Sequence, residues 1–283
     1  MQEDILTRIK TSYNQLGAAE MKVANLVTAD PGKVIFMSIS ELAEACGVSD
    51  STVFRFCQKL GAGGYQEFKM LLSLGLGKEE PKAEKADGEA APLGFSERAA
   101  RVLETNIAAL RETCSLLREE DVNRAVEAMH GAGRIAFFGA GASLLSAMKA
   151  MNKFMRITDK AVCVQDLHLQ AMQASLLRPG DAAVVFSYSG SSRDTVSAAR
   201  ITKGAGACVI CISRFRKSPL AEFADILLLS GANEGPLQGG STSAGMGQLF
   251  LADILYEEYY RRYYGESRAN NEKTSAAVAD RLY

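Results

Sequence analysis

Apolar residues follow two different patterns along this chain. Before residue 75 they recur at helical spacing, as in Val53, Phe56, Cys57 and Leu60 at i, i+3, i+4 and i+7. After residue 130, short apolar runs alternate with helical stretches. The expected strands are 134–138, 161–164, 182–186, 208–212 and 226–229, and the expected helices are 143–156, 167–177, 192–204 and 244–264. This alternation predicts an α/β fold with a parallel sheet of about five strands flanked by helices.

The first segment is expected to be all-α. Its predicted helices are 3–14, 18–29, 40–46 and 50–60. Gly47 can take the left-handed conformation that ends a helix, and Ser49 is a good N-cap for the helix that follows. Two short helices joined by a glycine-containing turn predict a helix-turn-helix.

A polar stretch separates the two segments. It begins near Gly75, carries many charges and includes Pro81 and Pro92, a composition typical of a flexible linker. The second segment opens with a long amphipathic helix over 97–117. The residues after 265 are polar again and predict a partly mobile tail, with 276–282 as a short terminal helix. The predicted organisation is 1–77 (helix-turn-helix domain), 78–94 (linker), 95–265 (α/β domain) and 266–283 (tail).

Hydroxyl groups cluster after the predicted strand 182–186. The turn reads Ser187, Tyr188, Ser189, Gly190, Ser191 and Ser192, and a helix follows. The start of a helix presents unpaired N–H groups and the positive end of its dipole. Gly190 lets backbone approach a ligand closely, and hydroxyls donate without adding charge. A plain helix cap needs only one hydroxyl, so several of them favour a phosphate site.

A second glycine-containing loop follows the strand 134–138. Gly139 and Gly141 have the spacing that opens a dinucleotide fingerprint, but Leu144 replaces its third glycine and Asp166 comes late after the second strand. Two hydroxyl-bearing loops, the first with Ser143, suit one phosphate better than a pyrophosphate. No cofactor is expected.

The second helix of the helix-turn-helix has a polar outward face. The candidate DNA-binding residues are Ser49, Ser51, Thr52, Arg55, Gln58, Lys59 and Lys69. Hydroxyls bond phosphates or bases, arginine can read guanine, and lysine neutralises phosphate. Residues 1–76 contain seven Lys or Arg and eight Asp or Glu, so their net charge supports DNA binding only weakly. A solvated helix face is the alternative.

Composition predicts where the protein is located and disfavours several classes of protein. The chain has 283 residues, a net charge of −1 and no apolar run long enough to span a membrane, which predicts a cytoplasmic protein with no membrane partner. The six cysteines read as buried thiols. Cys208 and Cys211 fall in one predicted strand and point to opposite faces, which disfavours a redox or zinc pair. No metal site is expected.

Two sets of motifs resemble a known family. Residues 34–43 (VIFMSISELA), 47–49 (GVS), 52–57 (TVFRFC) and 64–69 (GYQEFK) look like the DNA-binding domain of RpiR-type transcriptional regulators. Residues 138–143 (FGAGAS), 153–157 (KFMRI) and 168–172 (HLQAM), with Ser187-x-Ser189-Gly190, resemble their sugar isomerase (SIS) domain. The resemblance runs from residue 1 to about 264, except for the linker.

The resemblance implies a site for a phosphosugar. The phosphate would bind Ser187, Ser189 and Ser192, with Thr195 close by and Ser143 contributed by the first glycine loop. Glu234 stands where isomerases keep a catalytic carboxylate and regulators keep a ligand contact. The full candidate set is Gly141, Ser143, His168, Ser187, Ser189, Gly190, Ser192, Thr195 and Glu234. Tyr188 replaces a histidine that many relatives have, and Ala62 and Gly63 replace aromatic and basic residues.

The regulator interpretation competes with an enzyme. An isomerase needs an acid–base pair, and the chain has only His130 and His168. His130 is expected at a helix end, and His168 is either a ligand contact or a structural histidine. A fused helix-turn-helix would be unexplained in an isomerase, and a pure SIS scaffold would leave the serines idle. We therefore expect a non-enzymatic regulator in which a phosphosugar controls binding to double-stranded operator DNA.

Self-association is the last expectation. Tyr256, Tyr259, Tyr260, Tyr263 and Tyr264 recur along one face of the helix 244–264. A tyrosine stripe is usually core, but five phenol hydroxyls also suit a subunit interface. The apolar stripe of the helix 97–117 is a second candidate surface. A homodimer or a dimer of dimers is predicted.

Overall fold

The computed structural model describes residues 4–79, 94–232 and 242–279. Contacts between residues divide the chain into two compact units, and the division falls after Thr105, inside one long helix. The chain therefore crosses from one unit to the other within a regular element.

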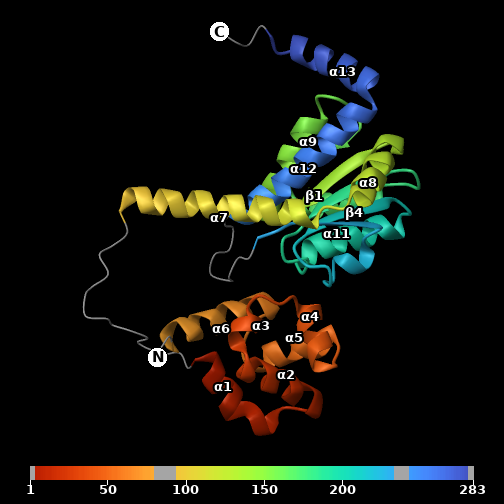
Figure 1. Cartoon of the computed structure of the whole chain (residues 1–283). Coiled ribbons are helices and arrows are strands. Elements are labelled where there is room, and N and C mark those ends of the chain that lie inside the picture. Colours follow the sequence, from red (N-terminus) through yellow and green to blue (C-terminus); the bar gives the residue numbers. More distant parts are fainter. Residues whose placement is uncertain (1–3, 80–93, 233–241, 280–283) are drawn as a thin grey trace. The chain divides into compact units, whose positions relative to one another are not determined.

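The first unit is all-α, as predicted. Between residues 4 and 79 its elements are α1 (Ile5–Ser12), a short 3-10 helix (Tyr13–Gln15), α2 (Ala18–Ala29), α3 (Pro31–Val34), α4 (Ile39–Cys46), α5 (Asp50–Lys59) and α6 (Tyr65–Glu79) (Figure 1). Their apolar faces form one core, in which Phe56 packs edge-on against Phe68 at 5.6 Å between ring centroids. The helix α6 continues through Gly75–Gly77, where the sequence predicted that a linker opens.

Local capping explains where the helix-turn-helix begins and turns. Ser38 Oγ accepts a hydrogen bond from Glu41 N at 3.1 Å, and the Glu41 carboxylate accepts one from Ser38 N at 2.8 Å. This capping box starts α4. Gly47 ends it with φ +61°, the left-handed conformation that was predicted. Ser40 Oγ then donates to the Asp50 carboxylate at 2.5 Å, which joins the two helices across the turn.

The second unit is built around a parallel sheet. Its strands are β1 (Ile135–Gly139), β2 (Ala161–Val162), β3 (Ala182–Phe186), β4 (Cys208–Ser213) and β5 (Ile226–Leu229). They lie in the order β2-β1-β3-β4-β5, and every neighbouring pair is parallel. The predicted fold class is confirmed. The strand β2 is two residues shorter than predicted because it pairs with β1 only at Ala161 and Val162.

Helices cover both faces of this sheet. The helices after residue 94 are α7 (Phe95–Leu116), α8 (Glu119–Gly131), α9 (Ala142–Phe154), α10 (Leu167–Ser175), α11 (Arg193–Gly204), a 3-10 helix (Ala221–Phe223), α12 (Thr242–Arg262) and α13 (Tyr264–Ala276). The core on one face includes residues of α8, α9 and α12, and the core on the other includes residues of α10 and α11 (Figure 1). Alternate strand residues therefore enter opposite cores, as the pleat requires.

The two helices at the ends of this unit differ from expectation. In α7 the fully buried side chains are Ala109 and Thr113, whereas Val102 and Leu103 of the predicted apolar stripe are 60% and 58% exposed. The polar residues after 265 form most of α13, and 280–283 lie outside the described residues. The tyrosine stripe of α12 faces inward at its centre, where Tyr259 is buried in the core.

The cysteines are free thiols, and Cys57 and Cys211 are buried. Burial raises the pKa of both thiols to about 12. Cys211 belongs to one core and Cys208 packs against the other, so the predicted opposite orientation is confirmed. The expectation that all six are buried is wrong: Cys114 is exposed on α7 and the other three are half-buried.

Candidate functional site

The two predicted ligand loops follow neighbouring strands. In the strand order β2-β1-β3, the chain leaves β1 toward one edge and returns on its other side at β3. Gly139 at the end of β1 is paired with Phe186 at the end of β3. Ligands of open parallel sheets bind at such a switch point, outside the carboxyl ends of the strands. The geometry therefore brings the Gly139–Ser143 loop and the serine turn together.

The backbone of the serine turn is fixed at Gly190. This glycine has φ +61°, and its N–H bonds Ser187 O at 3.3 Å. A Cβ at this position would collide with the Ser218 side chain and lie 3.0 Å from Ser213 Oγ. The Gly190 carbonyl also accepts from Leu220 N at 2.9 Å. Only glycine fits both the dihedral angle and the space.

The helix that follows the turn keeps its first N–H groups available to a ligand. Ser192 is the N-cap residue of α11, yet its side chain makes no cap hydrogen bond. Ser189 Oγ accepts from Ser191 N at 3.2 Å, and Ser191 Oγ donates to Ser189 O at 3.1 Å. Without a side-chain cap, the N-terminus of α11 presents its N–H groups and dipole to the space that these serines surround. This arrangement supports the anion site over the plain cap.

The other predicted ligand residues have different environments. Ser187 is buried, and so is Thr195, whose hydroxyl donates to Ser192 O at 3.1 Å and so supports the helix start from inside. Ser143 is half-buried and accepts from Gln248 Nε2 at 3.0 Å. His168 is exposed in the first turn of α10. Glu234 lies outside the described residues.

A buried glutamine supports the first glycine loop and was not predicted as a site residue. Gln170 is 2% exposed, and its amide bonds both the N–H and the carbonyl of Gly139, at 3.2 and 3.0 Å. It also donates to Val164 O at 3.0 Å. Gly141 has φ +54° and begins α9. A glutamine on the buried face of α10 was the available signal, because a buried amide must find partners.

The predicted DNA-contacting helix is α5, and most of the predicted side chains on it are exposed. Ser49, Ser51, Arg55 and Gln58 reach solvent. Ser49 Oγ bonds the hydroxyls of Ser51 and Thr52 at 2.8 and 3.1 Å rather than capping α5. Thr52 is only 7% exposed, so its expected place on the open face is wrong: its hydroxyl is enclosed between Ser49 and Arg55.

Two lysines of the predicted DNA face are engaged within the protein. Lys59 Nζ lies 2.6 Å from Glu20 Oε2, and this hydrogen bond lowers the pKa of Glu20. The contact with Lys59 joins α2 to α5, and Glu20 also accepts from Gly17 N at 2.8 Å. Lys69 is 5% exposed, and its Nζ donates to Met37 O at 3.1 Å. The expectation that Lys69 faces DNA is wrong, because its stem is buried in the core side of α6 and its amine reaches a backbone carbonyl inside.

Comparisons with known proteins agree with both halves of this description. The model of the helix-turn-helix domain of the rpiR family matches residues 3–79, and the SIS domain model matches residues 128–258. An HTH-type transcriptional regulator of Caldanaerobacter subterraneus subsp. tengcongensis is 32% identical over 98% of both chains. The solved structure of the Vibrio vulnificus NanR protein complexed with ManNAc-6P has a TM-score of 0.86 and 26% identity, covering 99% of this chain and 100% of that one.

The SIS fold is also present in a putative phosphosugar isomerase of Bacteroides fragilis, with a TM-score of 0.54 and 21% identity over 60% of this chain and 92% of that one. Helix-turn-helix and SIS units in this order define a class of DNA-binding proteins with a fused SIS domain. The chain belongs to the RpiR family of HTH-type transcriptional regulators. None of the helices in the described residues is long and apolar enough to cross a membrane.

Proposed function

We propose that this regulator binds a phosphosugar at the serine turn and that the bound sugar changes its affinity for operator DNA. The observation that carries the proposal is the start of α11, where Ser192 leaves the helix uncapped beside Ser187 and Ser189. Helix N-termini with free N–H groups are anion sites. The likeness to NanR, which was solved with ManNAc-6P, supports a phosphosugar as the ligand class.

We also propose that the chain has no isomerase activity. The chain has two histidines, and His130 is stacked on Tyr263 with 3.4 Å between ring centroids. His168 is exposed in the first turn of α10. An isomerase needs an acid–base pair at the substrate carbons, and neither histidine supports that role, so we propose that the chain binds a sugar phosphate without moving its protons.

A thermal-shift panel tests this function. The full chain is melted with hexose 6-phosphates and N-acetylated amino-sugar 6-phosphates, ManNAc-6P among them, and with the unphosphorylated sugars. A ligand that binds only the native state raises Tm, and the rise grows with the logarithm of its concentration relative to its Kd. We expect a rise with one or more phosphorylated sugars and none with their unphosphorylated counterparts. Equal rises for both forms would refute the phosphate site.

The first prediction applies to the turn itself. Ser189→Ala should weaken binding of the active sugar phosphate by about 1–3 kcal/mol, because one donor to the phosphate is lost. The Ser175→Ala variant changes a serine at the far end of α10, whose hydroxyl donates to Met172 O, and should bind like wild type. Isothermal titration of the three proteins checks this. Unchanged affinity in Ser189→Ala would move the phosphate elsewhere.

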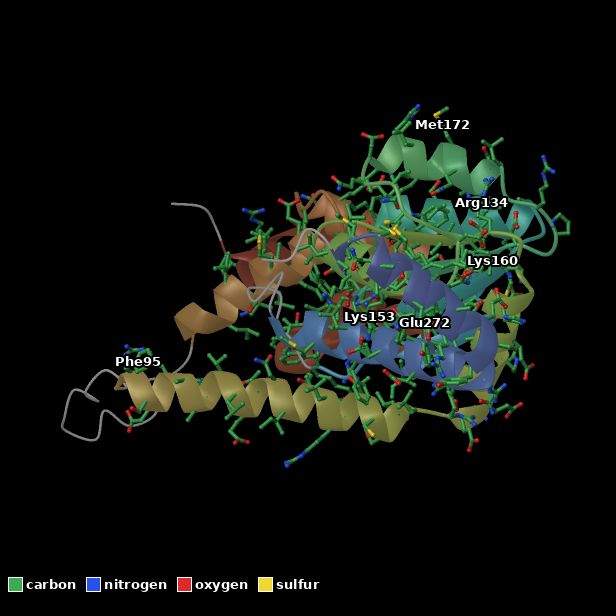
Figure 2. The ribbon with its side chains drawn as sticks, turned by 90° about the horizontal axis from the view of Figure 1, so that it is seen from above. Phe95, Arg134, Lys153, Lys160, Met172 and Glu272 are labelled. Atoms are coloured by element: carbon green, nitrogen blue, oxygen red, sulfur yellow. The ribbon has the colours of Figure 1, made fainter. Side chains whose placement is uncertain are left out.

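We further propose that the regulator acts as a homodimer on a two-fold operator. Recognition helices of a dimer can reach successive major grooves, which compensates for the low positive charge of the first unit. The tyrosine stripe of α12 is a weak interface candidate because Tyr259 is buried. The exposed apolar residues of α7, which include Phe95 at its end, support that helix as the contact surface (Figure 2).

A further inference from the structure

The C-terminal part of α7 is bonded to the loops that follow β4 and β5. One oxygen of Glu112 accepts from Arg214 Nη2 at 2.9 Å, and the other accepts from Ala232 N at 3.1 Å. Thr113 Oγ1 accepts from Gly231 N at 2.8 Å. Two residues of one helix therefore hold two consecutive backbone N–H groups of the loop after β5.

This contact leaves no free space. A Cβ on Gly231 would lie 2.6 Å from Thr113 N and 2.9 Å from Ala109 O. A Cβ on Gly247 of α12 would lie 2.9 Å from Thr113 Oγ1. Since the backbones approach so closely, a shift of the loop must displace α7 or break these hydrogen bonds.

The same loop is bonded to the serine turn through Tyr188. Tyr188 Oη donates to Ala232 O at 2.8 Å. The carbonyl of Tyr188 accepts from Arg214 N at 3.0 Å and from Ser213 Oγ at 3.3 Å. Ala232 is thus held on both sides, by Glu112 at its N–H and by Tyr188 at its carbonyl.

Ala232 has an unusual backbone conformation. Its φ is +140°, a value that residues with a side chain rarely adopt, and the residue is buried. Such a conformation persists only where surrounding contacts impose it. The bonds from Tyr188 and to Glu112 are among these contacts, so loss of the Tyr188 bond should let Ala232 relax and weaken its bond to Glu112.

The helix α7 is also the route by which the chain reaches the DNA-binding helices. It is one uninterrupted helix of 22 residues, about 33 Å long at 1.5 Å per residue (Figure 1). Residues 94–105 are exposed, whereas Ala109 and Thr113 are buried. Its direction is therefore set at the end that Glu112 and Thr113 hold.

We infer that Tyr188, Ala232 and Glu112 form a link that transmits the state of the serine turn to α7, and that the affinity of the chain for operator DNA depends on how α7 is held. This inference rests on the proposed binding of a phosphosugar at the turn. A phosphate that contacts Ser187 and Ser189 acts on the residues directly beside Tyr188. Coupling of the sugar site to the DNA site requires that the sugar and DNA favour different arrangements of this link, and that is what the test below measures.

The test separates ligand binding from the response to it. The Tyr188→Phe variant removes the hydroxyl that bonds Ala232 and keeps the ring that packs against Phe215. The Glu112→Gln variant keeps the shape of the side chain and removes its charge. Glu104→Gln, on the exposed half of the same helix, is the matched control.

Two quantities are measured on the full chain. The first is the Kd of the sugar phosphate that raises the wild-type Tm most in the panel above. The second is the ratio of the Kd for DNA with and without that sugar, on a duplex selected from random-sequence DNA by the wild-type protein. For wild type and Glu104→Gln we expect a ratio of about tenfold or more. For Tyr188→Phe and Glu112→Gln we expect a ratio near one and a sugar Kd within about threefold of wild type.

The double variant adds a second check. Because both residues belong to one link, Tyr188→Phe combined with Glu112→Gln should lose no more coupling than either alone. Hydrogen exchange of residues 106–116 should respond to the sugar in wild type and not in the variants.

The possible failures are distinguishable. If no phosphosugar raises the wild-type Tm, the effector site fails and the link fails with it. If wild type responds and both variants keep its ratio, the link alone is overturned. If the variants lose the sugar instead, Tyr188 and Glu112 belong to the binding site and do not transmit its state.

Discussion

Lys69 shows how a single side chain can reverse an expectation. Burial lowers the pKa of its ammonium to about 8 from an ordinary value of 10.5, although Glu41 nearby acts in the opposite direction. Below pH 8 the lysine is charged in both the folded and unfolded states, and the cost of burying the charge is present in full. Between pH 8 and 10.5 the unfolded chain binds more protons, so stability rises with pH.

The prediction compares wild type with Lys69→Met. The wild-type free energy of unfolding should increase relative to that of the variant between pH 8 and 10.5, by at most about 3 kcal/mol. Urea denaturation of the full chains at a series of pH values measures the difference. Taking the difference between the two proteins cancels the contribution of the buried thiols. Burial raises the pKa of Cys57 to about 12, so loss of this proton from the unfolded chain lowers the stability of both proteins as the pH rises. Parallel pH profiles would contradict a buried amine.

Glu20 offers a second prediction at this scale. Its carboxylate accepts a hydrogen bond from Lys59 on α5, so that cation is partly neutralised before DNA arrives. Glu20→Gln should release Lys59, tighten binding to any duplex and steepen the salt dependence by about 0.9 in log K against log salt. The amide oxygen can still accept from Gly17 N, so this bond at the start of α2 should persist. Glu44→Gln makes the same change of net charge on exposed α4 and should have a smaller effect.

Arg55 is the remaining cation on the open face of α5, where its Nη2 lies 3.5 Å from Thr52 Oγ1. Arg55→Ala should cost about 1–3 kcal/mol on a selected duplex and relax the base preference at one position. Fluorescence anisotropy on single-base variants of that duplex measures both effects. A uniform loss on all sequences would make Arg55 a phosphate contact.

At the scale of elements, the sequence predicts well wherever apolar residues are continuous or strictly periodic. The strand β3 has its predicted bounds because five consecutive apolar residues are all buried. The helix α2 likewise has its predicted bounds. The helix α13 was missed because it is polar throughout, and Ser267 is its buried residue. It is held instead by side-chain bonds such as that from Asn270 to Ile157 O at 3.0 Å.

The candidate site could likewise be predicted from the sequence only in part. Motif spacing placed both loops at one edge of the sheet, because parallel strands end on the same side. It did not reveal which hydroxyls would be free, since Thr195 and Ser192 differ only in where their side chains point after folding. The contacts of Glu112 with Ala232 and Arg214 join residues more than a hundred positions apart in the sequence, so no local sequence pattern predicts them.

For the whole molecule, the exposed apolar residues predict assembly. Val102 and Leu103 are neighbours on α7 and are more than half exposed, which is costly for a helix that stays alone in water. The paired change Val102→Asp and Leu103→Asp should dissociate the proposed homodimer at micromolar concentration. Leu169→Asp on α10, which is 48% exposed, is the control. Sedimentation velocity of the full chains distinguishes them, and a dimer that survives in the α7 variant would place the interface elsewhere.

The closed space around Gly190 has an evolutionary consequence. A methyl group there would strike Ser218, and the carbonyl already accepts from Leu220 N, so the phosphate end of the proposed site resists substitution at Gly190. Ser143 and His168 are only half-buried or exposed and tolerate replacement far better. We therefore expect descendants of this regulator to change the sugar they recognise while keeping the requirement for a phosphate. New effectors would be recruited from among phosphorylated metabolites before any other kind.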